Sequence, residues 1–384
     1  MGATQRPILL QIVSSRLWGG MERYALDISR AFDAMGWDVQ VITRDARMID
    51  TMFARAGLKV RHAPLSGYFD LTSTITLRRF LRRHSDAPLI AIHTHHYRDA
   101  FAALLARKLT RIPRSRVRVV CTHHRCRPAR EGALMRRIYR NLDAFIFVSA
   151  LARRRFLSRW PEGRAPFPDK AMHTLSPAID PADVPPYTPP PEKGPFTLLY
   201  LGRLSPEKGI ERLIRAMRLL KGKRVRLAIA GTGYADYVDS LHRLAEREGV
   251  GNLLDWKGWS ERPMELIADC HAGICVSPRE EPFSYASVEL MACGRAQIVP
   301  PDGAFGEYLT LTDTAAIESE SAPKDADSVR LSRLTEESIA QAVLALASRR
   351  DLCEEMGRRA LAASEKLPTS AEAMQRLRAL YLGA

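Results

Sequence analysis

Long hydrophobic runs are absent from this chain of 384 residues. No apolar stretch approaches the roughly 18–20 residues that a helix needs to span a bilayer. The N-terminus also lacks the basic segment, the long apolar segment and the small-residue cleavage site of a secretory signal peptide. We therefore expect a cytoplasmic protein, either free or held peripherally on the inner face of the cytoplasmic membrane.

Cysteine is scarce, and no two cysteines stand close together. The six residues are Cys121, Cys126, Cys270, Cys275, Cys293 and Cys353. None of them belongs to a Cys-x2-Cys pair, so the spacing argues against a zinc site or a thioredoxin-like centre. We expect ordinary reduced thiols in a reducing compartment.

Acidic residues are outnumbered by basic ones, which gives a net charge of +15. Much of the excess lies in the first half, for example Arg78, Arg79, Arg82 and Arg83 around Leu77, Phe80 and Leu81. Such a surface suits an anionic membrane or an acidic acceptor. Nucleic acid also fits electrostatically, but no nucleic-acid motif accompanies the charge, and we expect no such partner. A solvated, arginine-rich surface without a partner is the alternative.

Short apolar runs alternate with stretches of helical periodicity along the whole chain. Strands are predicted at residues 8–13, 39–42, 89–92, 117–121, 144–148, 196–201, 225–230, 272–276 and 297–299. Strands that alternate with helices predict parallel α/β sheets. Two such series in tandem indicate an α/β fold with two doubly wound, Rossmann-like domains, and a nucleotide would bind at the carboxyl ends of the second sheet.

A proline-rich segment separates the two series. Seven prolines lie between Pro181 and Pro195, which excludes a helix or a central strand there. We expect a first domain at residues 1–184, a linker at 185–195 and a second domain at 196–370.

Two carboxylates, Glu281 and Glu289, are separated by seven residues in the second series. We expect Glu281 to enter a helix and Glu289 to lie buried among its apolar positions, where it needs hydrogen-bond partners. The start of a helix offers unpaired N–H groups and a positive dipole end, which suit a phosphate. Carboxylates that accept sugar hydroxyls beside such an end suggest a nucleotide-sugar site.

The segment from Glu281 to Gly294 resembles the Glu-x7-Glu motif of retaining GT-B glycosyltransferases, in particular the GT4 family (glycosyl transferases group 1). The chain keeps Glu281, Pro282, Phe283, Glu289, Met291, Ala292 and Gly294 of that motif. It departs at Ser284, where the family usually has Gly, and at Leu290, where it usually has Ala. The resemblance implies that Glu281 reaches a sugar hydroxyl and Glu289 the ribose, with Phe283, Ser284 and Tyr285 at the donor.

A second resemblance lies in Gly202-Arg203 and Lys208-Gly209, which match the Gly-Arg-(Leu/Phe)-x-x-x-Lys-Gly element of the family. It implies that Arg203 and Lys208 grip the donor diphosphate, whose growing charge must be stabilised when the sugar leaves. Ser205 and Pro206 predict a helix start in the same loop. A surface Arg and Lys near a helix start is the alternative, but cations are unfavourable at that end.

Three glycine-containing loops match the family less specifically. Gly231 and Gly233 resemble a Gly-x-Gly turn after a strand, which is otherwise an ordinary tight turn. The loop that ends at Glu307 resembles a donor-sugar loop, but Ala304 replaces its second Gly. Gly19 and Gly20, followed by Glu22, resemble a loop over the donor phosphates, and Glu22 could instead only satisfy the helix dipole.

Histidines end two predicted strands. His124 aligns with the family histidine that contacts the donor sugar, and His123 is the fallback; His93, His95 and His96 end another strand. No carboxylate or thiolate accompanies them at ligand spacing, so we expect no metal. The Asp-x-Asp pair Asp325 and Asp327 is interpreted as a solvated loop.

The resemblance as a whole implies a retaining, metal-independent glycosyltransferase with no cofactor besides a nucleoside-diphosphate sugar. Its C-terminal helix, residues 371–384, would pack back on the first domain. Only the Ile-Asp end, Ile179-Asp180, remains of an Asn-Gly-(Val/Ile)-Asp element that precedes the linker in many relatives. We expect the acceptor to be a lipopolysaccharide or another cell-envelope glycan at a membrane surface. A soluble enzyme that makes a storage glycan or small glycoside, and a non-catalytic basic binding module, stay open as alternatives.

Overall fold

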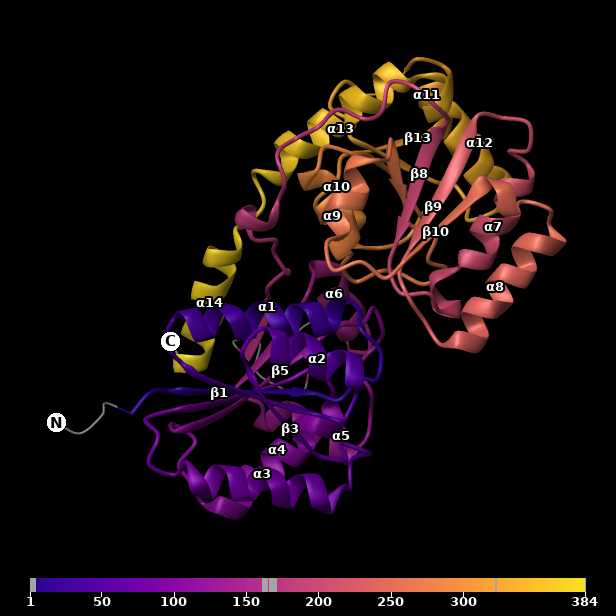
Figure 1. The fold of residues 1–384 in the computed structure, drawn as a ribbon. Coiled ribbons are helices and arrows are strands. Elements are labelled where there is room, and N and C mark those ends of the chain that lie inside the picture. The colour runs from indigo at the N-terminus through magenta and orange to yellow at the C-terminus, as the bar shows by residue number, and fades with distance from the viewer. Residues whose placement is uncertain (1–4, 161–164, 166–170, 322, 384) are drawn as a thin grey trace. The chain divides into compact units, whose positions relative to one another are not determined.

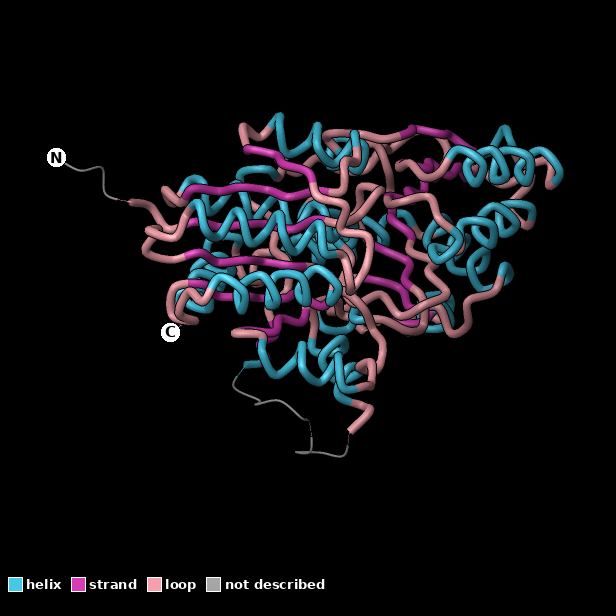
Figure 2. The backbone as a smooth tube through the Cα atoms, turned by 90° about the horizontal axis from the view of Figure 1, so that it is seen from below, coloured by secondary structure: helices cyan, strands magenta, loops and turns pink. Residues whose placement is uncertain are grey.

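The structure is a computed structural model that describes residues 5–160, 165, 171–321 and 323–383. Its contacts divide the chain into two compact units. The first unit holds residues 1–177 and 370–384, and the second holds residues 178–369. Each unit is a parallel sheet with helices between consecutive strands (Figures 1 and 2).

The first unit is a seven-stranded sheet in the order β3-β2-β1-β4-β5-β6-β7. Its strands are β1 (Ile8–Val13), β2 (Asp38–Thr43), β3 (Lys59–His62), β4 (Ile90–Thr94), β5 (Val117–His123), β6 (Ala144–Phe147) and β7 (Met172–Thr174). Its helices are α1 (Gly20–Ala34), α2 (Arg47–Arg55), α3 (Leu71–Arg83), α4 (Tyr97–Thr110), α5 (Ala133–Asn141), α6 (Ala150–Leu157) and α14 (Ser370–Leu382). Strand β1 is buried along its whole length, as expected of a parallel strand covered on both faces.

The second unit is also seven-stranded, in the order β10-β9-β8-β11-β12-β14-β13. Its strands are β8 (Phe196–Leu201), β9 (Val225–Ala230), β10 (Leu254–Gly258), β11 (Ala272–Ile274), β12 (Ala296–Val299), β13 (Leu311–Asp313) and β14 (Ser328–Arg330). Its α-helices are α7 (Ile210–Arg218), α8 (Ala235–Arg247), α9 (Pro263–Ala268), α10 (Tyr285–Ala292), α11 (Thr314–Glu318), α12 (Glu336–Ser348) and α13 (Arg350–Ser364). Short 3-10 turns are η2 (Pro181–Asp183), η3 (Pro206–Lys208), η4 (Gly251–Leu253) and η5 (Ala304–Glu307). The predicted α/β fold with two Rossmann-like domains is confirmed.

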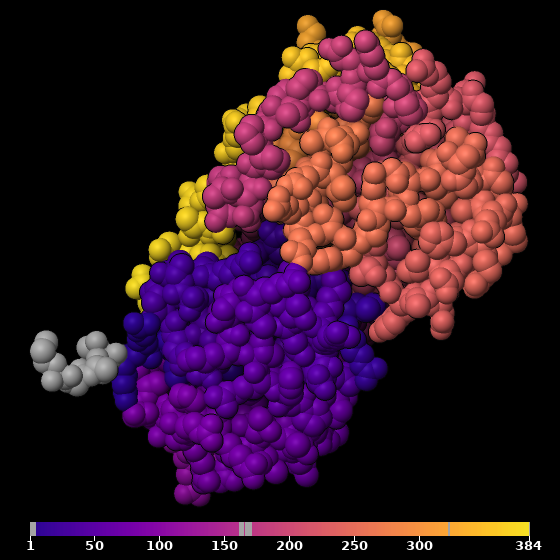
Figure 3. Space-filling model, viewed as in Figure 1, coloured from indigo at the N-terminus to yellow at the C-terminus, as the bar shows by residue number. Residues whose placement is uncertain are grey.

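The C-terminal helix α14 belongs to the first unit. It packs against α1, and the space-filling view shows the yellow end of the chain against the indigo surface of that unit (Figure 3). Tyr381 of α14 is fully buried, with its ring against Phe32 and Trp37. Ala384, the last residue of the segment expected there, lies outside the described residues.

The proline-rich segment is hydrogen-bonded to the second unit. Arg295 donates to the carbonyl of Thr188 (2.9 Å), and Arg350 donates to that of Gly194 (2.8 Å). His271 Nε2 lies 2.9 Å from the carbonyl oxygen of Pro191. These bonds explain why residues 178–195, which we expected to be divided between the first domain and a linker, pack with the second unit.

The helix expected to begin at Pro206 is interrupted. Residues Pro206–Lys208 form a 3-10 turn, and α7 begins only after Gly209, whose φ is 72°. A Cβ at Gly209 would lie 2.4 Å from the carbonyl oxygen of Val276, so both the positive φ and the close approach of the backbone require glycine. The turn therefore serves to place Lys208 beside the loop that follows β11.

None of the six cysteines, all of which the structure describes, forms a disulfide, and most of them are buried. Burial raises the pKa of Cys270 to about 12 and that of Cys275 to about 11, so both are thiols at neutral pH. Among the helices that the structure describes, none is both long enough and apolar enough to cross a membrane.

Candidate functional site

A pocket opens in the second unit at the carboxyl ends of β8 and β11, next to the first turn of α10. Its empty volume, part of which is open to solvent, is about 430 Å³. Its polar lining comes from Tyr200, Lys208, Ser277, Glu281, Ser284, Ser287 and Gln297, with Gly202 and Cys275 beside them. A doubly wound sheet binds ligands at this edge because its loops diverge there.

Glu281 and Lys208 form an ion pair in this pocket, with Lys208 Nζ 2.5 Å from Glu281 Oε1. Ser277 donates to the same carboxylate oxygen. Burial lowers the pKa of Lys208, but the carboxylate of Glu281, with a smaller contribution from Cys275, outweighs this effect and raises the pKa overall. Lys208 is therefore a cation throughout the neutral range.

Glu281 does not enter a helix, contrary to the sequence expectation. It lies in a loop that pairs with Gly303, and its carbonyl accepts a hydrogen bond from Ala304 (2.9 Å). Helix α10 begins four residues later at Tyr285. The pairing between the two loops therefore positions the backbone of Glu281.

Arg203 takes a different direction from Lys208. Its Nη2 donates to Glu207 (2.8 Å). Arg203 is not among the described residues that line the pocket. Its carbonyl accepts a hydrogen bond from Tyr200 (3.0 Å). The structure thus brings Lys208 to Glu281, while Arg203 is engaged with an acidic residue of its own turn.

The start of α10 explains one departure from the family pattern. Ser284 is the N-cap residue, and its hydroxyl accepts a hydrogen bond from the Ser287 N–H at 3.2 Å. This bond satisfies one of the free N–H groups of the first turn, which glycine cannot do. Phe283 packs edge-on against Tyr285 and also against Tyr308, so it braces the loop.

The second departure, Leu290 in place of Ala, has a partner in β11. A Cβ on Gly273 would lie 2.1 Å from Cδ1 of Leu290. The larger side chain therefore occupies space that only a glycine in the neighbouring strand leaves open. Glu289, the preceding residue, is 5% exposed on α10, and its predicted burial is confirmed. It does not line the pocket.

The glycines of the β8 and β9 loops are required by packing between the two loops. A Cβ on Gly231 would lie 1.9 Å from the carbonyl oxygen of Gly202, and one on Gly233 would lie 2.0 Å from that of Leu204. Gly202 lines the pocket, whereas Gly231 and Gly233 do not. The exposed Glu307 lies in η5, also away from the pocket.

Ser277 and Gln297 line the pocket but were not selected from the sequence. Gln297 accepts from the Ser287 hydroxyl (2.5 Å) and donates to its carbonyl (2.9 Å). Gln297 could have been selected from the sequence, since it is a single amide inside the apolar strand β12. A buried polar side chain needs hydrogen-bond partners, which points to a polar neighbourhood at that position. Ser277 carries no such signal, since a serine after a strand is common in loops.

In the first unit, the expected glycine loop leads directly into α1. Gly19 is the N-cap residue in an extended conformation, and Gly20 is the first residue of the helix. Glu22 is buried in the first turn, where its charge also suits the helix dipole.

The histidines of β4 and β5 divide between two faces of the sheet. His124 Nε2 lies 3.0 Å from Nδ1 of His95, beside Tyr24. His123 lies on the other face, where its Nδ1 is 2.5 Å from the hydroxyl of Tyr97 among Phe145 and Phe156. Successive residues of a strand point to opposite faces, so the two candidates are not interchangeable. His124 is half-buried, and His123 is part of an aromatic core.

We expect the first unit to lose stability in acid. Burial lowers the pKa of both His93 and His123 from 6.5 to about 3. Between these values the two histidines bind more protons in the unfolded chain than in the folded unit, so their contribution to stability is constant above about pH 6.5 and falls as the pH drops below it. Each histidine contributes a slope of about 1.4 kcal/mol per pH unit in that window.

Urea unfolding at pH 7.5, 6.0 and 5.0 measures this slope. The variant His123→Phe suits the aromatic surroundings and removes one titrating group, so its free energy of unfolding should depend less on pH than that of the wild type. An equal slope in the two proteins would contradict the assignment.

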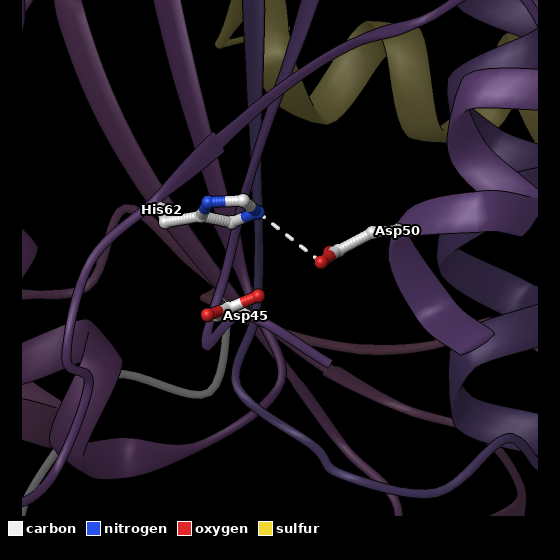
Figure 4. A group of neighbouring side chains, drawn as sticks. All are labelled: Asp45, Asp50 and His62. Atoms are coloured by element: carbon white, nitrogen blue, oxygen red, sulfur yellow. Dashed lines mark hydrogen bonds and ion pairs between the residues drawn. The ribbon is translucent and has the colours of Figure 1, made fainter. Parts of the chain in front are cut away.

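Asp45, Asp50 and His62 form a group of three potential metal ligands near the ends of β2 and β3 (Figure 4). The ligand atoms lie within 4.8 Å of one another. Asp50 already accepts from Thr43 (2.5 Å) and lies 3.1 Å from His62 Nε2. Asp50 of α2 thus connects the ends of β2 and β3 by hydrogen bonds.

Of the two residues of the Asp-x-Asp pair, only Asp325 is exposed to solvent. Asp327 is 1% exposed, and its carboxylate accepts from the N–H of Thr310 at 3.1 Å. The sequence expectation therefore fails for Asp327, which ties the chain before β14 to the chain before β13.

Known proteins match both units. Residues 18–183 match the family described as Glycosyltransferase Family 4, and residues 188–360 match Glycosyl transferases group 1. A GDP-mannose-dependent alpha-(1-6)-phosphatidylinositol dimannoside mannosyltransferase of Mycobacterium tuberculosis is 32% identical over 127 residues, which make up 32% of each chain. A lipopolysaccharide 1,2-N-acetylglucosaminetransferase of Salmonella typhimurium is 29% identical over 124 residues, 29% of this chain and 32% of that protein. The alignments thus span 32% of the length of these relatives.

Among solved structures, HepE from Anabaena in complex with UDP and glucose has a TM-score of 0.76 with this chain at 16% identity. The likeness covers 96% of this chain and 98% of that protein, and it establishes a shared fold. Together with the two family matches, which cover both units, it leads to one conclusion. The chain belongs to the GT4-type glycosyltransferases of the GT-B fold.

Proposed function

We propose that this protein transfers a sugar from a nucleoside-diphosphate sugar to a hydroxyl acceptor, with retention of the anomeric configuration and without a metal ion. The observation that carries the proposal is the Lys208–Glu281 ion pair at the carboxyl ends of β8 and β11. It places a permanent cation and a hydrogen-bond acceptor in one pocket beside the start of α10. A diphosphate and the sugar attached to it need both.

The leaving group determines what the cations do. As the glycosidic bond breaks, negative charge grows on the diphosphate, and Lys208 stabilises it as a fixed point charge. Arg203 exchanges its half-exposed ion pair with Glu207 for the phosphate, because such surface pairs contribute little. A guanidinium then binds phosphate oxygens through two parallel hydrogen bonds.

The two carboxylates orient the donor. Glu281 accepts from a sugar hydroxyl once Lys208 moves to the phosphate, and Glu289 accepts from the ribose. The acceptor hydroxyl attacks on the face that the diphosphate leaves, and a phosphate oxygen takes its proton. This route needs no separate base.

A thermal-shift screen with UDP-, GDP-, ADP- and CMP-linked sugars, each with and without EDTA, tests the donor. We expect the sugars linked to one of these nucleotides to raise the melting temperature of the wild type, and EDTA should not change this shift. The same nucleotide sugars should not raise the melting temperature of the double variant Glu281→Gln, Lys208→Met. If no nucleotide sugar raises it, the proposed donor is wrong. A shift that EDTA removes would overturn the metal independence.

We further propose that the acceptor is a lipopolysaccharide or other cell-envelope glycan at an anionic membrane. Both curated relatives named above act, by their names, on lipid-linked glycans. In this chain, large apolar side chains are exposed at the start of α3: Phe69 is 79% and Leu71 is 68% exposed. Arg79, Arg82 and Arg83 are exposed further along the same helix. Apolar residues beside basic ones suit the headgroup region of an anionic bilayer.

Co-sedimentation with vesicles of anionic and of neutral lipid tests this surface. We expect binding to the anionic vesicles at low salt, a loss at high salt, and weaker binding of the double variant Phe69→Ser, Leu71→Ser. Leu219→Ser, at an exposed leucine of the second unit, is the matched control. Turnover of a soluble sugar acceptor together with indifference to lipid would instead identify an enzyme of storage glycans or small glycosides.

A further inference from the structure

A chain of buried polar side chains crosses the sheet of the first unit from β1 to the end of β5. Gln11 lies on β1, His95 follows β4, and His124 follows β5, and these three strands are neighbours in the sheet. His95 Nε2 lies 3.2 Å from Gln11 Oε1, and His95 Nδ1 lies 3.0 Å from His124 Nε2. Gln11 is fully buried and His95 is 4% exposed, so water does not compete for these bonds.

The two histidines of the chain are uncharged at neutral pH. Burial lowers the pKa of His95 and of His124 well below the usual value, and neighbouring histidines lower it further. A neutral imidazole carries one proton, so each ring has one donor nitrogen and one acceptor nitrogen. The partner of one nitrogen therefore decides the state of the other.

The amide of Gln11 decides the direction of the whole chain. In the structure the Oε1 of this amide faces His95, while its Nε2 is buried without a partner among the described residues. An amide oxygen only accepts, so in this orientation Nε2–H of His95 donates to it. Nδ1 of His95 is then unprotonated and accepts from Nε2–H of His124. This leaves Nδ1 of His124 without a proton. Among the described residues no hydrogen bond to that nitrogen is made, and His124 is half-buried, so this edge of the ring remains for a ligand.

The rings are also held in place. His95 stacks on His93 with ring centroids 4.7 Å apart, and Tyr24 of α1 packs edge-on against both His95 and His124. The tilt of the His124 ring is therefore as fixed as its tautomer.

We propose that Gln11 and His95 are positioning residues that hold His124 as the Nε2-protonated tautomer and so present its Nδ1 as an acceptor for a hydroxyl of the ligand. A bare imidazole nitrogen binds an O–H donor and repels a phosphate or carboxylate oxygen. The ligand at this edge is therefore a sugar hydroxyl, and this identification rests on the proposed function. The tautomer itself does not.

Ring-nitrogen NMR of the full-length protein labelled with ¹⁵N-histidine, without any ligand, reads the tautomer directly. The His124 signals are assigned as those lost in His124→Gln. We expect a protonated, pyrrole-type Nε2 and an unprotonated, pyridine-type Nδ1. The opposite pattern, or an average of the two, overturns the proposal.

The variant Gln11→Met keeps the size of the side chain and removes the acceptor. We expect the His124 signals to become an average of both tautomers. We also expect kcat/KM to fall about tenfold, as is typical when a residue that hydrogen-bonds to a ligand-binding residue and orients it is replaced. Gln40 on β2 is also a buried glutamine of the same sheet, so Gln40→Met is the matched control. It should change neither the His124 tautomer nor kcat/KM. An unchanged His124 tautomer in Gln11→Met overturns the role of Gln11.

If Gln11→Met does not fold, His95→Leu removes the next member of the chain. The same averaging of the His124 signals is expected there, and a fixed tautomer overturns the role of His95. Because the NMR readout needs no substrate, an enzyme that binds no nucleotide sugar but shows the expected tautomer would refute the proposed function alone.

Discussion

Lys208→Met lowers kcat by about 10²–10³-fold while the protein stays folded. The side chain of Lys208 is 26% exposed and forms its ion pair with the carboxylate of Glu281. Without it, the growing charge on the diphosphate loses the cation that faces the pocket, and among the described residues the Glu281 side chain keeps the Ser277 hydroxyl as its hydrogen-bond partner. Initial rates with the donor identified by the thermal-shift screen measure the effect.

Two further variants separate the role in the reaction from a role in stability. Lys221→Met removes an exposed lysine of the same unit that donates to the carbonyl of Glu248 and lies outside the pocket, so its rate should match that of the wild type. Lys208→Arg keeps the charge but changes its geometry, and we expect an intermediate rate. If Lys208→Met turns over at the wild-type rate, the proposed stabilisation of the leaving group is wrong.

Arg295→Met lowers the stability of the second unit by about 3–5 kcal/mol, the largest effect on folding that we expect from one substitution. Arg295 is 1% exposed. Its guanidinium donates to the carbonyls of Cys270, Cys293, Gly294, Thr188 and Ala268. These carbonyls include those at the ends of α9 and α10, where a cation is favourable. In the variant they stay buried without donors.

Calorimetry of the intact protein should show the transition of the second unit about 10 °C lower. Arg295→Lys keeps the charge with fewer donors, so we expect a smaller shift. The control Arg218→Met removes a half-exposed arginine whose ion pairs to Glu248 and Glu336 are long, and it should cost less than about 0.5 kcal/mol. An Arg295→Met transition within 2 °C of the wild type would contradict the argument.

Local patterns could be predicted where neighbours in the sequence decide the structure. Nine of the fourteen described strands were recognised, because a parallel strand buried on both faces needs a continuous apolar run, as in β1 and β8. The strands β3, β7, β10, β13 and β14, which lie at or next to the edges of the sheets, were missed. The burial of Glu289 followed from the apolar residues on either side of it. Lys208 was selected through its motif, and the structure places it against Glu281.

Other features depend on pairs of residues that are far apart in the chain. The prediction of a helix that begins at Pro206 was wrong, because Gly209 packs against Val276. The prediction that Glu281 enters a helix was wrong, because its loop pairs with Gly303. Nothing near Leu290 indicates that Gly273 makes room for it. The sequence did not indicate that residues 178–195 pack with the second unit, because their partner Arg295 lies about a hundred residues later and contacts them only in the folded chain.

By itself the sequence determined the α/β class, the existence of two units, and the residue types that suit a diphosphate and a sugar, since periodicity and composition are local properties. The tertiary structure alone decided which of these side chains meet. It paired Lys208 with Glu281, directed Arg203 to Glu207, and connected His124 through His95 to Gln11. The physical reason is that hydrogen bonds and ion pairs act over a few ångströms in space, and only the folded sheet brings residues of different strands that close.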